Sequence, residues 1–380
     1  MKILVTDADS RKGYDIINIL KNVHGYELIL FASSGNRLVL PSVYGQIVHQ
    51  INVENSSLFT QNLNSALDLQ DSSAFCYMAV SEKATLCFYD YMRNEEKYAD
   101  RISFMLPELD TFQLARNKKQ FQEYCETKGL PVPKSYGGHN INDLKNQFRP
   151  VIAKKNIGAG SVGMIYVEQK QDLQRLNEIE HNAYLIQEKI ESDKNIHGGF
   201  YLCNDGETIS YHGHRRIRTF PEKGGVTVYS STDETEEIRQ IGEDLLKKLN
   251  WSGFAMIEFM YDVNAQQWKI IELNPRLWGS IMLSEFCDAS LLENYVRMCK
   301  NEPPVNNKVL SERYIRWLFP FEFLNLIKGD VSLRDFLNQD NKSICYINFT
   351  YGSWMSNLFF QLFFTINLRS VTRYFKKIFS

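Results

Sequence analysis

Two apolar segments late in the chain carry oxygen-bearing side chains that suit a divalent cation. Glu258 lies in the first segment, and Glu272 and Asn274 lie two positions apart in the second. Because side chains alternate along a strand, Glu272, Asn274 and then Arg276 share one face, which Glu258 can join from a neighbouring strand. Carboxylate and amide oxygens suit Mg²⁺ at a phosphate site. The alternative is a solvated strand face, which the apolar neighbours of both glutamates disfavour.

A glycine-rich loop follows a strand that ends in lysine. Lys154 lies near the end of the run 150–157, and the loop after it contains Gly158, Gly160, Ser161 and Gly163. Backbone N–H groups in such a loop can surround an anion while the lysine supplies charge. The loop reads G-x-G-x-x-G, yet a strand follows it where a dinucleotide site needs a helix, and G-K-[ST] is absent. It is therefore either a phosphate-covering hairpin or a plain flexible turn.

The surrounding pattern predicts the elements that position these residues. Runs at 254–260 and 269–276 predict a hairpin with a turn at 262–267. Helical spacing from 110 to 128 predicts one helix that ends at Gly129. Further helices are expected near 172–180 and 234–249.

The N-terminal region predicts a separate parallel layer. A strand at 2–6, a helix at 13–22 and a strand at 27–32 make a β-α-β opening. The turn at 7–13 lacks the dinucleotide fingerprint, so a nicotinamide-binding role is disfavoured.

Composition narrows the classes of protein further. The 380 residues include 43 Lys and Arg against 45 Asp and Glu, so no overall basic field favours nucleic acid. The seven cysteines are scattered without a C-x-x-C pair, which argues against a disulfide framework or a zinc knuckle. The N-terminus does not read as a signal peptide, and we expect a cytoplasmic protein.

The C-terminal segment 354–380 has a broad apolar face and a polar stripe that ends in basic residues. This pattern predicts an amphipathic helix. We expect it either to pack on the protein body or on a second copy in a homodimer, or to lie on a membrane surface.

From about Leu114 to about Ile281 the motifs together resemble the ATP-grasp superfamily, of the carboxylate–amine or carboxylate–thiol ligase type with a carbamoyl-phosphate-synthase-like ATP-binding fold. The resemblance implies that Lys118 approaches the α-phosphate, that Lys154 is a second nucleotide lysine, and that 158–163 is a mobile loop over the phosphates. It further implies the adenine-reading hinge Gln187, Glu188, Lys189 and Ile190, the metal ligands Glu258, Glu272 and Asn274, and Arg276 facing the transferred phosphoryl group.

Some positions depart from the family pattern or extend it. Lys154-Lys155 stands where a lysine–proline pair is usual, and the ribose-binding acid is open between Glu191 and Asp193. The segment 212–225 is similar to an arginine–glycine turn of carboxylate–amine ligases, which implies that Arg216 and Arg218 meet an anionic substrate group or the γ-phosphate. A solvated cationic turn is the alternative.

The resemblance implies an α/β and α+β protein in four parts. These are a Rossmann-like pre-ATP-grasp domain (1–110), an ATP-grasp small subdomain (111–190), a large subdomain with the metal site (191–305) and a C-terminal helical extension (306–380). The implied activity is an ATP- and Mg²⁺-dependent ligase, with Mn²⁺ as an alternative metal, that joins a small carboxylate to an amine. A non-catalytic nucleotide-binding protein and a carboxylase or kinase-like enzyme are the alternatives.

Overall fold

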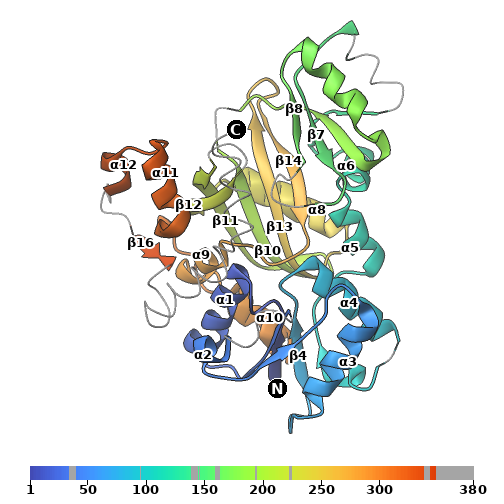
Figure 1. Ribbon diagram of the computed structural model, residues 1–380, viewed down its shortest axis with the longest axis vertical. Helices are drawn as coiled ribbons and strands as arrows, with labels where there is room; N and C mark the ends of the chain where they lie inside the picture. The colour runs from blue at the N-terminus through green and yellow to red at the C-terminus, as the bar shows by residue number, and fades with distance from the viewer. Residues whose placement is uncertain are drawn as a thin grey trace. The chain divides into compact units, whose positions relative to one another are not determined.

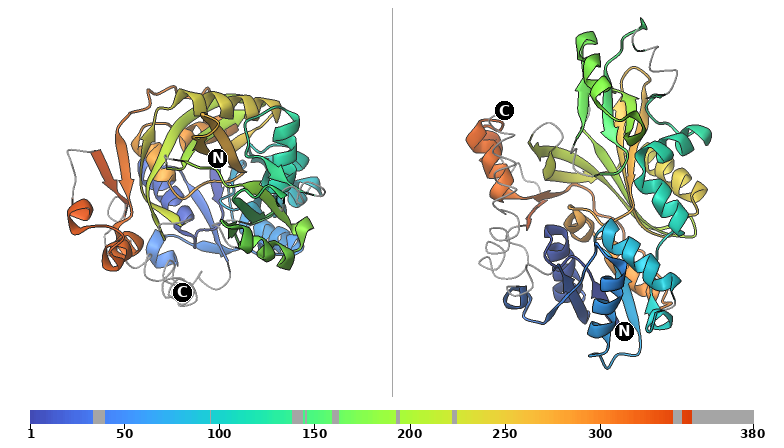
Figure 2. Two further views of the ribbon diagram at one scale, coloured as in Figure 1. Left: turned by 90° about the horizontal axis from the view of Figure 1, so that it is seen from above. Right: turned by 45° about the vertical axis from the view of Figure 1, so that its right-hand side comes forward.

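The computed structural model describes residues 1–33, 40–94, 96–137, 144, 146–158, 163–192, 195–221, 225–337 and 343–347 (Figure 1, Figure 2). The chain forms two compact units, each built from more than one stretch. The first unit contains Met1–Met105, Val228–Ser230 and Arg276–Ser380, and the second contains Leu106–Thr227 and Ser231–Pro275. Each of the four domains predicted from the sequence, with boundaries at 110, 190 and 305, is one continuous stretch of chain, whereas each of these units consists of several stretches.

The first unit begins with the predicted parallel α/β layer. Its elements are β1 (Lys2–Val5), α1 (Arg11–Asn18), the π turn η1 (Ile19–Val23), β2 (Leu28–Ala32), α2 (Leu40–Tyr44), β3 (Val48–Gln50), α3 (Ser56–Leu67), β4 (Phe75–Met78), α4 (Glu82–Arg93), the 3₁₀ turn η2 (Ala99–Arg101) and β5 (Ile102–Ser103). The parallel strands lie in the order β3-β2-β1-β4-β5. Helices α1 and α2 cover one face and α3 and α4 the other (Figure 1). The β-α-β opening is confirmed.

The later part of the first unit adds short elements. They are α9 (Ile281–Phe286), α10 (Leu291–Cys299), β15 (Arg313–Arg316), the π turn η6 (Leu318–Glu322), α11 (Phe323–Lys328), α12 (Leu333–Leu337) and β16 (Ser343–Tyr346). Among helices of the described residues, none is long and apolar enough to cross a membrane. The amphipathic helix predicted at 354–380 lies outside the described residues.

The second unit holds two antiparallel sheets. Its elements are α5 (Leu109–Arg116), α6 (Lys118–Thr127), β6 (Ser135–Tyr136), β7 (Val151–Lys155), β8 (Ile165–Val167), the 3₁₀ helices η4 (Lys170–Glu178) and η5 (His181–Ala183), β9 (Tyr184–Glu188), β10 (His197–Asn204), β11 (Glu207–Phe220), β12 (Val226–Asp233), α8 (Glu236–Lys248), β13 (Gly253–Asp262) and β14 (Gln267–Asn274). The smaller sheet has the order β6-β9-β7-β8, and the larger, seven-stranded sheet has the order β14-β13-β10-β11-β12-β15-β16, of which β14 to β11 and the two ends of β12 belong to this unit.

The helix predicted from 110 to 128 is two helices. Asn117 adopts an extended conformation (φ −91°, ψ 101°), and its side chain accepts a hydrogen bond from Gln120 N, which caps α6. The prediction of one continuous helix was therefore wrong, because an N-cap interrupts the helical spacing. The predicted end is confirmed, since Gly129 adopts a left-handed conformation (φ 68°) just after α6. The helix expected near 172–180 is the 3₁₀ helix η4.

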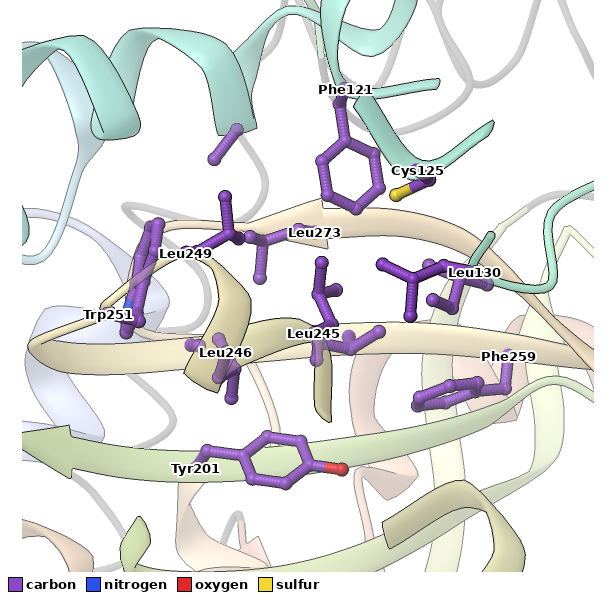
Figure 3. Close-up of a cluster of buried hydrophobic side chains, with 14 of the residues drawn as sticks. Phe121, Cys125, Leu130, Tyr201, Leu245, Leu246, Leu249, Trp251, Phe259 and Leu273 are labelled. Carbon is purple, nitrogen blue, oxygen red and sulfur yellow. The ribbon is translucent and has the colours of Figure 1, made fainter. Parts of the chain in front are cut away.

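The core of the second unit covers one face of the large sheet, so polar side chains of the candidate site can lie only on the other face. Side chains of α5, α6 and α8 pack on one face of β10, β13 and β14 (Figure 3). The strand residues in this core include Tyr201, Ile257 and Leu273. Because neighbours along a strand alternate, Glu258, Glu272 and Asn274 point to the opposite face.

Gly242 allows α8 to lie close to Tyr201 of β10, because glycine has no side chain. A Cβ atom at Gly242 would lie 2.0 Å from Tyr201 Oη, which donates a hydrogen bond to Ile238 O at 3.1 Å. We expect Gly242→Ala to lower the free energy of unfolding by about 1–3 kcal/mol, because the methyl group must push α8 from β10. Urea unfolding measures this. Gly137→Ala, whose Cβ would meet nothing within 4 Å, is the control. Equal effects of the two changes would contradict the argument.

Candidate functional site

Two glutamates lie directly opposite each other on the face of the large sheet that points away from the core formed with α5, α6 and α8. Glu258 of β13 pairs in register with Glu272 of β14, and Met256 pairs with Asn274. The Asn274 Nδ2 donates a hydrogen bond to Glu272 Oε1 at 2.9 Å. The predicted hairpin is therefore confirmed, and it gathers the three proposed metal ligands on one face.

Lys118 joins this group from the start of α6. Its backbone N donates to Asn156 O at 2.8 Å, which ties the first turn of α6 to the end of β7. Its Nζ donates to Gly158 O at 2.9 Å and lies 3.2 Å from Glu272 Oε2. The break at Asn117 thus places Lys118 in contact with both Gly158, after the small-sheet strand β7, and Glu272 of the β13–β14 hairpin.

Lys154 of β7 adds a second lysine, a buried residue that is 9% exposed. Burial lowers the pKa of Lys154, against the opposing charges of Glu272 and Glu258. Burial alone would raise the pKa of Glu272, but the charge of Lys118, the hydrogen bond from Asn274 and the charge of Lys154 together lower it. The site therefore pairs an ionised carboxylate with a lysine that an additional anion would stabilise in its charged form.

Arg216 supplies a third cation, from β11. Its guanidinium donates a hydrogen bond to Glu258 Oε1 in an ion pair. Gly198 of β10 lies between the two strands and pairs in register with both Glu258 and His214. Residues that pair in register share a sheet face, so Gly198 leaves this face without a side chain between Glu258 and His214. Sequence reasoning assigned Arg216 to a substrate anion and missed Glu258 as its partner.

The histidines beside Arg216 are buried and neutral. Burial lowers the pKa of His212 to about 4 and that of His214 well below its ordinary value. Phe200 packs against both rings.

The predicted hinge residues lie at the end of β9. Glu188 Oε1 accepts hydrogen bonds from Lys134 N at 2.8 Å and from Lys269 Nζ at 3.0 Å. Lys189 N donates to Pro150 O at 2.9 Å, while its side chain pairs with Glu168. Ile190 is buried. The glutamate expected to read adenine is thus already bound on one oxygen by protein groups.

Of the two candidate ribose acids, Glu191 accepts a hydrogen bond from Asn264 Nδ2 at 3.4 Å, and Asp193 lies outside the described residues. In the glycine loop, Gly158 and Gly163 are described, whereas Gly160 and Ser161 are not. Gly163 has a φ of 76°, which glycine adopts without strain.

Arg276 does not continue the strand. β14 ends at Asn274, and Pro275, which has no N–H to donate, follows. The expectation that Arg276 shares the strand face of Glu272 was therefore wrong. Arg276 belongs to the first unit, where its Nε lies 3.5 Å from Glu82 Oε1. Arg218 is half-buried further along β11.

Within the described part of the chain, no three His, Cys, Asp or Glu side chains are grouped to hold a metal ion. A cation at Glu258 and Glu272 would therefore depend on the amide oxygen of Asn274 and on oxygens from a ligand or water.

Comparison with known proteins identifies the middle of the chain. Residues 115–280 match the family described as "ATP-grasp domain". The matched part of the chain, which contains Lys118, Lys154 and the β13–β14 hairpin, is therefore similar to an ATP-grasp domain.

Longer similarities agree with that domain. The chain is 21% identical to urea amidolyase of Lachancea kluyveri over 241 residues, which are 57% of this chain and only 13% of that protein. It resembles the complex of Campylobacter jejuni biotin carboxylase with β-γ-ATP (TM-score 0.63, 16% identity, 82% of this chain and 74% of that one). It also resembles the biotin carboxylase domain of Hydrogenobacter thermophilus 2-oxoglutarate carboxylase, solved with MgADP and bicarbonate (TM-score 0.62, 14% identity, 82% and 73%). At these identities the structures show a shared fold.

Lys269 of β14 connects the end of β9 to the turn of the β13–β14 hairpin. The periodicity of the sequence did not predict this contact. Its Nζ lies 3.0 Å from Glu188 Oε1 and 2.8 Å from Asp262 Oδ2, and only 8% of Lys269 is exposed. Burial would raise the pKa of Asp262, but the hydrogen bonds from Lys269 and the turn amides lower it. In the native protein this carboxylate therefore adds stability above its unfolded pKa, and the contribution is lost as the pH falls through its lowered pKa.

We expect Lys269→Met to cost about 3–5 kcal/mol of unfolding free energy at pH 8, because two partly buried carboxylates then share a site without a cation. The loss should be smaller at pH 5, since removal of the lysine takes away a hydrogen bond and a charge that lower the pKa of Asp262, and protonation of this carboxyl relieves the repulsion. Urea unfolding at both pH values tests this. Lys247→Met, which breaks an exposed pair with Glu207, is the matched control. A loss independent of pH would refute the role of charge.

Proposed function

We propose that this chain is an ATP-dependent ligase that activates a carboxylate as an acyl phosphate for attack by an amine. The observation that carries the proposal is the row of opposing charges on one face of an ATP-grasp domain. Glu258 and Glu272 lie opposite each other, with Arg216 on the first and Lys118 on the second. Two carboxylates and three nearby cations, with Lys154, suit a metal-bound polyphosphate.

The residues present fit Mg²⁺, and Mn²⁺ is the alternative. Glu258, Glu272 and the Asn274 amide oxygen would hold the ion, since all three lie together on the strand pair. The bound ion supplies neutralisation of phosphate charge. The similarity to a fold solved with MgADP supports this assignment. Lys118 and Lys154 would bind phosphate oxygens directly, and the anion would raise the pKa of Lys154 back toward its ordinary value.

The proposed reaction has two steps. A carboxylate oxygen of the first substrate attacks the γ-phosphorus, and the bond to the β–γ bridging oxygen breaks, so that ADP leaves. The amine nitrogen then attacks the acyl carbon, phosphate departs with the C–O electron pair, and the nitrogen loses a proton. The loop at 158–163 would exclude water from the acyl phosphate. Arg216 and Arg218 would stabilise the charge that develops on the transferred group, and the same role for Arg276 stays a prediction from the family resemblance.

A carboxylase is the second candidate. The similarities to urea amidolyase and to two biotin carboxylase structures favour it. In that case bicarbonate would replace the organic carboxylate as the attacking oxygen. Release of ADP that requires bicarbonate alone would select this candidate. The proposed partners are small molecules in either case, and the cytoplasmic location and the contacts of 354–380 stay predictions.

The decisive measurement is Mg²⁺-dependent ADP release with pooled carboxylates, amines and amino acids. We expect Glu272→Gln to lower this rate at least about a hundredfold, because the site loses a charged oxygen ligand. Glu207→Gln, at an exposed glutamate, should leave it unchanged. ATP binding without ADP release from any pool would instead favour a non-catalytic protein.

Arg216→Met should reduce ADP release at least about tenfold, because Glu258 loses its cation and the transferred group loses a donor. Its neighbour Arg215 is exposed and gives the control Arg215→Met. Full activity in both variants would show that Arg216 of β11 has no part in the reaction.

A further inference from the structure

Helix α1 carries a basic and an acidic side chain one turn apart, in a part of the first unit that the proposed function does not use. Arg11 and Asp15 are four residues apart, so they lie on the same face of α1. Helix α9 contacts both α1 and β15, and Trp317 follows β15 directly. The guanidinium carbon of Arg11 lies 4.4 Å from the centroid of the Trp317 ring. Arg11 therefore connects this face of α1 to Trp317.

Asp15 is a carboxyl group whose surroundings do not compensate its charge. The residue is 3% exposed, and its Oδ2 has no hydrogen-bond partner among the described residues. Burial raises the pKa of Asp15 to about 7, although the charge of Arg11 acts in the opposite direction. A buried carboxylate costs free energy unless a cation or hydrogen-bond donors meet it. The Oδ2 atom therefore indicates a ligand or water that donates to it.

Trp317 has the complementary deficiency. The residue is 1% exposed, and its Nε1–H, which can only donate, has no acceptor within the part of the chain that the structure covers. Its backbone N donates to Val228 O at 2.8 Å, which holds the main chain in place just before η6. A buried indole N–H normally has a partner, so this atom indicates a ligand or water that accepts from it.

The three side chains together fit a small molecule that carries both charges. A carboxylate has two oxygens, so it can accept from the guanidinium of Arg11 and from the indole N–H of Trp317. An ammonium group would supply Asp15 with hydrogen bonds and a positive charge. A single ordered water could also donate to Asp15 and accept from Trp317, but it brings no charge to a buried carboxylate. An α-amino acid combines the two charged groups on one carbon atom.

We propose that Arg11, Asp15 and Trp317 form a binding site for a free α-amino acid. Arg11 and the Trp317 Nε1–H bind the α-carboxylate, and Asp15 binds the α-ammonium group. The site goes beyond the proposed function, because all three residues belong to the first unit and none takes part in the proposed reaction. Arg11 is only half-buried, so its side chain still reaches solvent. These contacts involve groups that all α-amino acids share, so they define the class of ligand.

The test measures binding of each of the twenty common L-amino acids to the full chain by isothermal titration calorimetry without nucleotide. We expect at least one of them to bind. Its N-acetyl and carboxamide derivatives should bind at least about tenfold more weakly, because each derivative lacks one of the two charges and its charged hydrogen bonds.

Trp317→Phe isolates the contribution of the indole N–H, because it keeps an aromatic ring beside Arg11. We expect this change to weaken the bound amino acid at least about tenfold. Trp251→Phe is the matched control, since the Nε1 of this buried tryptophan already donates to Phe254 O at 3.3 Å. The control should keep the wild-type affinity.

Asp15→Asn separates ligand binding from a structural role. Because the pKa of Asp15 in the native protein lies above its unfolded value, its ionisation at pH 8 destabilises the native protein. The variant should therefore melt at the same or a higher temperature than the wild type at pH 8, while it binds the amino acid at least about tenfold more weakly. Asp100→Asn, at an exposed aspartate, should change neither quantity.

Several results would overturn the proposal. Binding of none of the twenty amino acids by the folded wild-type protein would show that an ordered water only occupies the site. Equal affinity for the N-acetyl derivative would remove the role of Asp15. Unchanged affinity in both Trp317→Phe and Asp15→Asn would place the bound amino acid elsewhere. Because these measurements contain no ATP, a failure of the proposed ligase activity stays distinguishable from a failure of this site.

Discussion

The arrangement of the site depends on two like charges that face each other across a pair of strands. Carboxylates at directly opposed positions repel, and the cost grows as they leave water. Glu258 and Glu272 occupy such positions, and each is compensated by a cation from another element. The hairpin is therefore stable only when α6 places Lys118 beside Glu272 and β11 places Arg216 beside Glu258. This requirement explains why these two elements lie next to the hairpin.

The same requirement explains why the secondary structure breaks where it does. A continuous helix through Asn117 would have no free first turn, whereas the capped start of α6 lets Lys118 N bind Asn156 O. The end of β7 thereby becomes fixed to the helix that packs on the hairpin. Lys269 makes the corresponding connection at the other end, between the hinge and the turn of the hairpin.

Sequence patterns predicted the parts that depend on local periodicity. The β-α-β opening, the metal hairpin and the glycine after α6 follow from alternation, helical spacing and backbone conformation. The prediction failed where one side chain overrides the pattern, as at Asn117, or where proline ends a strand before Arg276. Partners such as Lys269 with Glu188 could not be found, because periodicity does not encode contacts between elements distant in the chain.

Gly198 has a consequence for how the site can vary between related chains. A Cβ atom there would lie 3.4 Å from His214 Nδ1, which is an ordinary van der Waals contact, so a methyl group fits beside His214. A larger side chain at Gly198 would stand on the sheet face between Glu258 and His214, next to the ion pair of Glu258 with Arg216. A substitution at Gly198 could thus break the ion pair between Glu258 and Arg216, although Gly198 carries no charge itself. The residue type at position 198 would then determine whether the carboxylate of Glu258 on the β13–β14 hairpin is neutralised by Arg216.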